Sequence, residues 1–307
     1  MGTPDFAVPS FRALLDNGYE VVGAICQPDR PKGRGNKLTA CPVKEAALAA
    51  GVPVFQPERI KRPEGVAMLR ELAPDLCVTA AFGQILSQEI LDIPPLGTIN
   101  VHSSLLPRHR GSAPINWSII KGDEVTGVTT MFTDKGMDTG DILLKAETPI
   151  GERETAGELS DRLAALGAEL LIRTLRELEA GTLERTPQNP DEATYEPKME
   201  KELGRIDFAC KAREIDCLVR GTVPWPGAFT TLDGQAVKVF EVRAVSGVPS
   251  GEPGEVVAAD AKRGLIVSCG DCDLELLQIQ MPGAKRMSAT DYLRGHSIDT
   301  GIRLGKA

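Results

Sequence analysis

Helix-like and strand-like segments alternate along the first 180 residues, and this alternation limits the possible folds more than any other feature. Ala-rich amphipathic segments are typical of helices, whereas the short β-branched runs between them are typical of strands. The predicted helices are 7–18, 42–51, 63–74 and 158–181, and the predicted strands are 20–27, 52–56, 75–82 and 97–102. Repeated strand–helix units form mostly parallel sheets that helices cover. We therefore predict an α/β, Rossmann-like domain with a mostly parallel sheet over residues 1–181.

The pattern changes after Gly181. Residues 182–203 hold three prolines and scattered charges, which predicts a linker. Residues 204–307 open with one helix, 208–221, for which Asp207 is the expected N-cap. Short strands at regular spacing follow, with a hairpin signal at residues 233–234. This region is predicted to form a smaller β-barrel domain.

Composition excludes several classes of protein. A chain of 307 residues suits two domains, and 42% hydrophobic with 25% charged residues is ordinary for a globular protein. No apolar run approaches the roughly 20 residues that cross a bilayer, and the N-terminus lacks a secretory pattern. Seven cysteines at irregular spacing do not suggest a disulfide framework. We expect a cytoplasmic protein with no membrane association.

Residues 27–44 are locally basic although the chain carries a net charge of −8. Five basic side chains face one acid in this segment, and its glycines give it conformational freedom. It is either a solvated surface loop or a mobile arm that contacts phosphates through Arg30, Lys32, Arg34 and Lys37.

Two polar residues end the predicted strand 97–102. Asn100 and His102 share one face because side chains alternate along a strand. The carboxyl ends of strands are where α/β sheets bind ligands. An amide donor beside an imidazole could hold a carbonyl oxygen that becomes an oxyanion, and could move a proton. The alternative is a buried histidine whose ring nitrogens find hydrogen-bond partners within the core and which has no catalytic role.

Asp138 lies in "DKGMDTGDIL", between glycines that let the backbone approach a ligand. A carboxylate against His102 would orient the ring and favour its charged form. The alternative is a turn residue, and spacing does not establish that positions 102 and 138 meet.

Seven ordered motifs carry a resemblance over almost the whole chain. They are "MGTPDFAVPS", "QPDRPKGRGNKL", "VPVFQPERIK", "AFGQILS", "INVHSSLLPRHRGSAPIN", "GVTTMFTDKGMDTGDIL" and "VRGTVPWPGAF". The sequence resembles the methionyl-tRNA formyltransferase family. This resemblance implies transfer of a formyl group from 10-formyltetrahydrofolate, a cosubstrate, to the α-amino group of methionyl-initiator tRNA, without a metal. It also implies an OB-like barrel that lies along the tRNA, and we expect a monomer.

The resemblance also implies residue roles. Asn100, His102 and Asp138 would form the catalytic centre. The folate would contact Ser104, Leu105, Leu106 and Pro107 on one side, and Gly83, Gln84, Ile85 and Leu86 on the other. The acceptor end of the tRNA would meet Arg30, Lys32, Arg34 and Lys37.

Some positions depart from the family or stay open. Family members carry a short apolar strand ahead of the motif at Met1, so we expect a weakened first strand–helix unit. His109 stands where an aromatic residue is more usual. Arg110 either anchors its loop, which we favour, or meets an anion. Cys269 and Cys272 form a CxxC that we interpret as a hairpin turn, since zinc usually needs four ligands.

Two other enzymes and one non-enzyme compete with this interpretation. A related formyltransferase could act on an amino-sugar nucleotide or on glycinamide ribonucleotide. The basic segment 27–44 argues against both. A nucleic-acid-binding protein with a relic catalytic domain would bind tRNA without turnover, and the intact residues 100, 102 and 138 argue against it.

Overall fold

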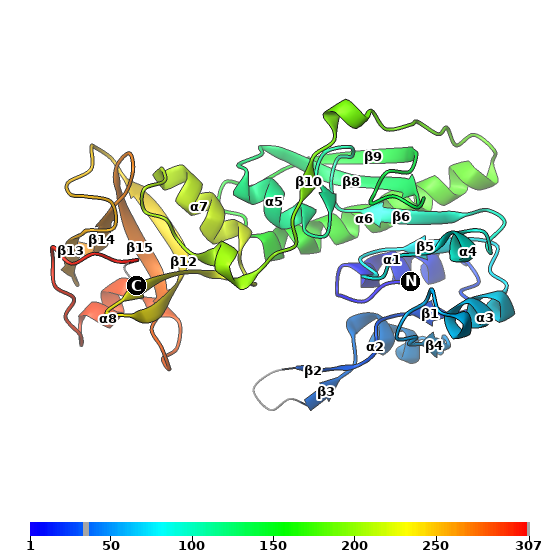
Figure 1. Cartoon of the computed structure of the whole chain (residues 1–307), viewed down its shortest axis with the longest axis horizontal. Coiled ribbons are helices and arrows are strands. Elements are labelled where there is room, and N and C mark those ends of the chain that lie inside the picture. The colour runs from blue at the N-terminus through cyan, green and yellow to red at the C-terminus, as the bar shows by residue number, and fades with distance from the viewer. Residues whose placement is uncertain (33–36, 306–307) are drawn as a thin grey trace. The chain divides into compact units, whose positions relative to one another are not determined.

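The computed structural model describes residues 1–32 and 37–305 and shows two units (Figure 1). Unit 1 comprises Met1–Pro114, Val125–Pro149 and Leu159–Pro197. Unit 2 comprises Ile115–Glu124, Ile150–Glu158 and Lys198–Ala307. The chain therefore passes between the units several times. Within the described residues, no helix is both long and apolar enough to span a membrane.

The main sheet of unit 1 has four strands in the order β5-β6-β8-β9. They are β5 (Cys77–Thr79), β6 (Thr98–His102), β8 (Val125–Phe132) and β9 (Ile142–Pro149). β5 and β6 are parallel, as predicted, whereas β6–β8 and β8–β9 are antiparallel. A short loop joins β8 to β9, and strands joined in this way must run in opposite directions. A separate parallel pair joins β1 (Ala24–Ile25) to β4 (Val54–Phe55).

The first two residues connect these two sets of parallel strands. The Gly2 amide donates to the Ile25 carbonyl at 3.0 Å, and the Ala80 amide donates to the Met1 carbonyl at 3.0 Å. The Met1 ammonium group donates to the Val78 carbonyl at 2.6 Å. Burial lowers the pKa of this amine, because desolvation disfavours its charged form.

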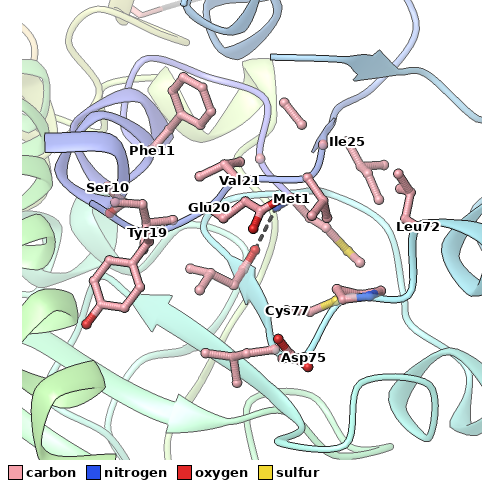
Figure 2. Close-up of a pocket in the computed structure, with 18 of the residues that line it drawn as sticks. Met1, Ser10, Phe11, Tyr19, Glu20, Val21, Ile25, Leu72, Asp75 and Cys77 are labelled. Carbon is pink, nitrogen blue, oxygen red and sulfur yellow. Dashed lines mark hydrogen bonds between the residues drawn. The ribbon is translucent and has the colours of Figure 1, made fainter. Parts of the chain in front are cut away.

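An apolar cavity of about 630 Å³ lies beside Met1 (Figure 2). Its lining includes Tyr19, Val21, Leu72 and Cys77. The predicted strand 20–27 is reduced to the two residues of β1, and residues 19–23, which precede them, line the cavity. The first strand–helix unit is thus incompletely packed.

The helices of the first 180 residues match the predicted ones closely, with two short additions, α4 and α5. They are α1 (Ala7–Asp16), α2 (Pro42–Ala49), α3 (Pro63–Leu72), α4 (Gln88–Leu91), α5 (Pro114–Ile120) and α6 (Ala156–Glu179). α6 buries Leu159, Leu163 and Leu170, in agreement with a role in packing. Gly167 of α6 faces Val101, where a Cβ would approach the valine side chain to 2.8 Å.

Four short strands and two 3-10 turns complete the elements outside the two larger sheets. They are β2 (Arg30–Lys32), β3 (Lys37–Thr39), β7 (Arg110–Gly111), β10 (Tyr195–Glu196), η1 (Pro190–Glu192) and η2 (Lys201–Gly204). β2 and β3 pair as an antiparallel hairpin, and β7 pairs with β10. The segment predicted as a linker, 182–203, therefore contributes a strand to unit 1 through β10.

Where the sequence predicts a smaller β-barrel domain, unit 2 contains an antiparallel sheet of six strands. Its elements are α7 (Ala212–Gly221), β11 (Ala228–Leu232), β12 (Gln235–Val245), β13 (Val256–Asp260), β14 (Gly264–Ser268), β15 (Asp273–Gln280), β16 (Met287–Ser288) and α8 (Ala289–Leu293). The β11–β12 turn has positive φ at Asp233 and Gly234, as the hairpin signal predicts.

The predicted N-cap of α7 is wrong. The helix begins at Ala212 with Lys211 at the N-cap position, and the Lys211 amide donates to the Glu214 carboxylate at 2.8 Å. The Asp207 carboxylate instead accepts from the Ala209 amide at 2.9 Å, which makes a local turn ahead of the helix.

Candidate active site

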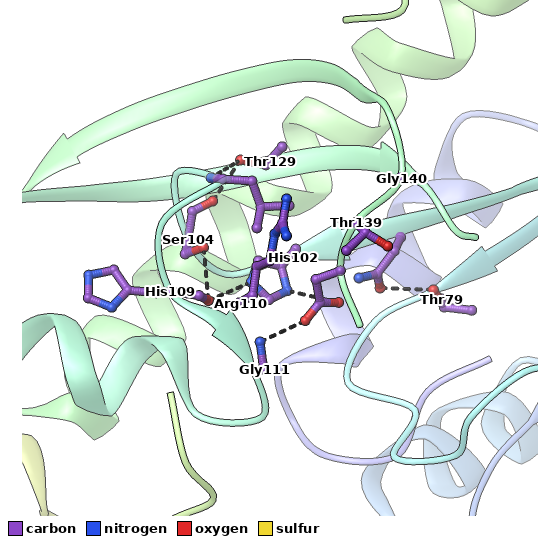
Figure 3. Close-up of polar contacts among 12 residues, drawn as sticks. Thr79, His102, Ser104, His109, Arg110, Gly111, Thr129, Thr139 and Gly140 are labelled. Atoms are coloured by element: carbon purple, nitrogen blue, oxygen red, sulfur yellow. Dashed lines mark hydrogen bonds and ion pairs between the residues drawn. The ribbon is translucent and has the colours of Figure 1, made fainter. Parts of the chain in front are cut away.

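Strand β6 places Asn100 and His102 on one face, at the carboxyl end of the strand. Asn100 lies opposite Thr79 of β5 and Met131 of β8, and His102 lies opposite Thr129. The Thr79 hydroxyl donates to the Asn100 side-chain oxygen at 2.8 Å (Figure 3). Because the Asn100 oxygen faces Thr79, the NH₂ group of the same amide points away from Thr79 and can donate to another group.

The imidazole of His102 has two distinct environments. The ring is buried, with 5% of its surface exposed, and Nε2 lies 3.0 Å from the His109 carbonyl oxygen. A carbonyl can only accept, so Nε2 carries a hydrogen. Nδ1 lies 3.7 Å from the Asp138 Oδ1 atom, which is beyond direct hydrogen-bond distance but within the range of charge attraction. Nδ1 is therefore the nitrogen that can gain or lose a proton.

Asp138 is held in place by the loop that follows β6. It lies between β8 and β9 with φ of 54°, in the left-handed region where Asp is better tolerated than most residues. The Gly111 amide donates to its Oδ2 atom at 2.8 Å. A Cβ at the neighbouring Gly140 would lie 1.8 Å from the Phe132 carbonyl oxygen. Gly140 is needed for chain packing.

The loop between β6 and β7 is stabilised from within. The Ser104 hydroxyl donates to the Arg108 carbonyl at 2.7 Å and lies 3.3 Å from the His109 carbonyl. The Thr129 hydroxyl donates to the Ser104 carbonyl and accepts from the Leu106 amide. These contacts fix the carbonyl that meets His102.

Arg110 anchors the loop, in agreement with the preferred interpretation. Its guanidinium is buried and donates to the Gln188 side-chain oxygen at 2.7 and 3.1 Å, and to the Tyr195 hydroxyl at 2.7 Å. These three hydrogen bonds go to side chains of residues 188 and 195, which suits a role as the anchor of the loop.

The predicted folate-contacting residues differ in how far they reach solvent. Ser104, Leu106 and Pro107 are buried, whereas Leu105 is partly exposed. A ligand could therefore reach the side chain of Leu105 more readily than those of its neighbours.

The second predicted folate segment, residues 83–86, precedes α4. Ile85 exposes 74% of its surface, while Leu86 is buried. Gln84 is anchored, because its oxygen accepts from the Ile60 amide at 2.7 Å and its NH₂ group donates to the Pro57 carbonyl at 3.1 Å. Gly83 has φ of 76°, a conformation that suits glycine.

Three of the four predicted tRNA-contacting residues, Arg30, Lys32 and Lys37, lie on the paired strands β2 and β3. Arg30 is exposed at the start of β2. Lys32 and Lys37 occupy paired positions at the end of the two strands. Arg34 lies outside the described residues.

Two other features lie apart from this centre. The cavity beside Met1 is not lined by Asn100, His102 or Asp138. The CxxC forms the turn between β14 and β15, where the Cys269 thiol donates to the Cys272 carbonyl at 3.0 Å. Cys269, Asp271 and Cys272 each offer one metal-ligand atom, and these atoms lie within 4.8 Å of one another. Burial raises the pKa of the Cys272 thiol to about 11, which disfavours the thiolate that metals bind. The hairpin interpretation fits better.

Sequence reasoning missed the residues that hold the catalytic groups in place. Thr79 orients Asn100, and Gln188, Thr194 and Glu196 contact the two loops around His102. All four are common residue types. Thr79 lies in a segment predicted as a strand, and the other three lie in the segment predicted as a linker. The sequence carries no signal that brings them to the site, because their partners are distant in the chain.

Known proteins resemble both halves of this chain. Residues 1–175 match the family model described as formyl transferase, and residues 198–297 match the one described as formyl transferase, C-terminal domain. The chain is 53% identical over 308 residues to the methionyl-tRNA formyltransferase of Ruminiclostridium cellulolyticum, covering 100% of this chain and 98% of that protein. It is 50% identical over 311 residues to the protein of the same name from Acetivibrio thermocellus, with the same coverage.

Solved structures share the fold at lower identity. An N-formyltransferase from Helicobacter canadensis, in complex with folinic acid and dTDP-3-aminofucose, has a TM-score of 0.66 at 19% identity, covering 93% of this chain and 97% of its own. HypX from Aquifex aeolicus, in complex with tetrahydrofolic acid, has a TM-score of 0.59 at 20% identity over 83% of this chain. The matched region is 47% of that HypX chain.

Proposed function

This chain belongs to the methionyl-tRNA formyltransferase family, and on that premise we propose that it transfers the formyl group of 10-formyltetrahydrofolate to the α-amino group of methionyl-initiator tRNA. The observation that carries the proposal is the convergence of Asn100, His102 and Asp138, predicted from the sequence alone, around the end of β6. The full-length identity of about half to relatives of that name supports the same substrate pair.

The polar groups of the site suit formyl transfer between two amines. The amine attacks the formyl carbon and a tetrahedral intermediate with a negative oxygen forms. Its collapse breaks the bond from the formyl carbon to N10 of the folate, which takes up a proton and leaves as tetrahydrofolate. The Asn100 NH₂ group, oriented by Thr79, would donate to that oxygen. His102 would donate to it from Nδ1 when protonated, since Nε2–H is occupied by the His109 carbonyl. Asp138 would stabilise the charged ring and accept, through water, the proton that the attacking amine loses.

The loops beside the catalytic groups suit a flat, partly apolar folate. Ile85 is exposed and Leu105 is partly exposed. The Gln27 side chain donates to the Gly83 carbonyl and the Leu106 amide donates to the Thr129 hydroxyl, so other elements hold the backbone of both segments. We assign residues 83–86 and 104–107 to the folate-binding site. The described residues supply the donors and the apolar walls without recourse to a metal.

Our proposed contacts with the acceptor end of the tRNA are Arg30, Lys32 and Lys37 on the hairpin β2–β3, and Arg34. Flexible cationic side chains can meet phosphates without a preformed pocket. We further propose that the enzyme works as a monomer in the cytoplasm. Its seven cysteines carry free thiols, which supports a reducing compartment.

One parallel assay tests the function. The full chain is supplied with 10-formyltetrahydrofolate and, in separate reactions, methionyl-initiator tRNA, free methionine or an amino-sugar nucleotide. Formylation of the charged tRNA alone is expected. Preferential formylation of the amino sugar would instead favour the alternative formyltransferase, and tRNA binding without turnover would favour the relic domain.

A further inference from the structure

Gln188 joins two parts of the active site although it lies in the segment that the sequence describes as a linker. Its NH₂ group donates to the carbonyls of Asp138 and Gly140, both at 2.8 Å. Its side-chain oxygen accepts from the buried guanidinium of Arg110. One amide thus ties the loop that carries the catalytic carboxylate to the loop that follows β6.

Thr194 and Glu196 hold the other side of the same loop. The His109 amide donates to the Thr194 hydroxyl at 2.8 Å, and the Arg110 amide donates to the Thr194 carbonyl at 2.8 Å. The His109 Nδ1 atom lies 2.9 Å from the Glu196 Oε1 atom, with both side chains buried. These contacts hold His109, whose carbonyl oxygen accepts a hydrogen bond from Nε2 of His102.

We propose that Gln188, Thr194 and Glu196 form a positioning clamp for the catalytic centre, in which Gln188 sets Asp138 and the pair Thr194–Glu196 sets the carbonyl that fixes the His102 ring. The proposal rests on the proposed function for its kinetic consequences, but not for its geometry. Gln188, Thr194 and Glu196 are positioning residues, since each acts on His102 or Asp138 through another group.

The clamp has a physical reason. Asp138 stands in a left-handed conformation and lies 3.7 Å from His102, so no direct hydrogen bond holds the two side chains together. Their separation is set by backbone contacts, those of Gly111 on the carboxylate and of Gln188 on the carbonyls of residues 138 and 140. Small displacements of groups in such a centre reduce catalysis strongly.

The substitution Gln188→Glu tests the hydrogen bonds that the Gln188 NH₂ group donates to the carbonyls of residues 138 and 140. Glutamate keeps an oxygen for Arg110 and adds an ion pair, but its second oxygen faces two carbonyls that it cannot donate to. The matched control is Asn189→Ala, which removes the neighbouring side chain, whose contacts are with Asp191 and Glu192 and not with the active site. Gln188→Glu is expected to lower kcat about ten- to hundredfold with KM for both substrates nearly unchanged. Asn189→Ala is expected to keep kcat, and a thermal melt should show that both variants remain folded at the assay temperature.

Glu196 provides a second test by conservative rescue. Glu196→Gln keeps an acceptor for His109 and is expected to retain most of the activity, whereas Glu196→Leu should lose it. The ¹⁵N resonances of the His102 ring should move in Gln188→Glu and Glu196→Leu and stay in place in Asn189→Ala. Because the NMR readout needs no substrate, it tests the clamp even if the parent enzyme formylates another acceptor. Unchanged ring resonances together with parental kcat in Gln188→Glu would overturn the inference.

Discussion

At the scale of single residues, the partners of His102 determine its tautomer. The His109 carbonyl requires a hydrogen on Nε2, which leaves Nδ1 as the atom that exchanges protons beside Asp138. Asn100 is oriented in the same manner, since the Thr79 hydroxyl occupies its oxygen. The donors that would meet an oxyanion are thus set before any substrate arrives, which is the condition for strong electrostatic catalysis.

Removal of the imidazole should therefore abolish most catalysis. His102→Ala is expected to lower turnover about 10²–10³-fold, equivalent to about 2.7–4 kcal/mol of barrier. The measurement is single-turnover formylation of charged tRNA, with a thermal melt to show that the fold persists. His296→Ala is the control, since this exposed histidine stacks on Tyr292 in unit 2 and touches none of the proposed catalytic residues. Near-normal turnover in His102→Ala would refute the assignment.

At the scale of elements, the hairpin β2–β3 carries the predicted tRNA contacts. Arg34→Glu is expected to raise the KM for charged tRNA severalfold and to reduce its dependence on salt, because fewer phosphate counterions are released on binding. The KM for the folate should stay unchanged. Lys145→Glu on β9, an exposed lysine, makes the same change in net charge and serves as the control. Equal damage to both substrates would contradict a hairpin dedicated to tRNA.

The cavity beside Met1 predicts a gain in stability from a short extension. Five apolar, β-branched residues fused ahead of Met1 would continue its pairing with β1 and β5 and fill part of the 630 Å³. They would also replace a buried ammonium group by a neutral peptide. The melting temperature should rise. An extension of five serines is the control, and equal melting temperatures for the two fusions would mean that the cavity does not accept a strand.

Elements near in sequence were predictable and contacts distant in sequence were not. The helices α1, α2 and α3 follow apolar periodicity and glycine stops, and β6 ends on the polar pair that the sequence singles out. β1 is shorter than its β-branched run because a strand also needs a partner, which periodicity does not report. Gln188 and Glu196 belong to a proline-containing segment with no periodic signal, so their place at the site follows only from the tertiary fold.

At the scale of the whole molecule, the two units are interleaved in the sequence. Unit 2 includes residues 115–124 and 150–158 in addition to the chain after residue 197. Within unit 2, the Asn116 side chain donates to the Gly221 carbonyl, and the Arg220 guanidinium donates to the Glu154 carbonyl. A cut in the predicted linker would therefore remove partners that the earlier segments need.

A fragment of residues 1–197 should accordingly be less stable than the same residues in the full chain. Its residues 115–124 and 150–158 would lose their packing partners, including those of the buried Ile119. Hydrogen exchange is expected to show lower protection there than in the intact protein. Co-expression of residues 198–307 should restore that protection. Identical protection with and without the second fragment would show that the first part folds independently.

The short loop after β6 has one more consequence. The carbonyl of His109 and the amide of Gly111 are two residues apart, yet they serve as the reference points for the imidazole and for the carboxylate respectively. A shift of this stretch would displace both groups in the same motion. A substitution that moves residues 109–111 is therefore expected to disturb the imidazole and the carboxylate together.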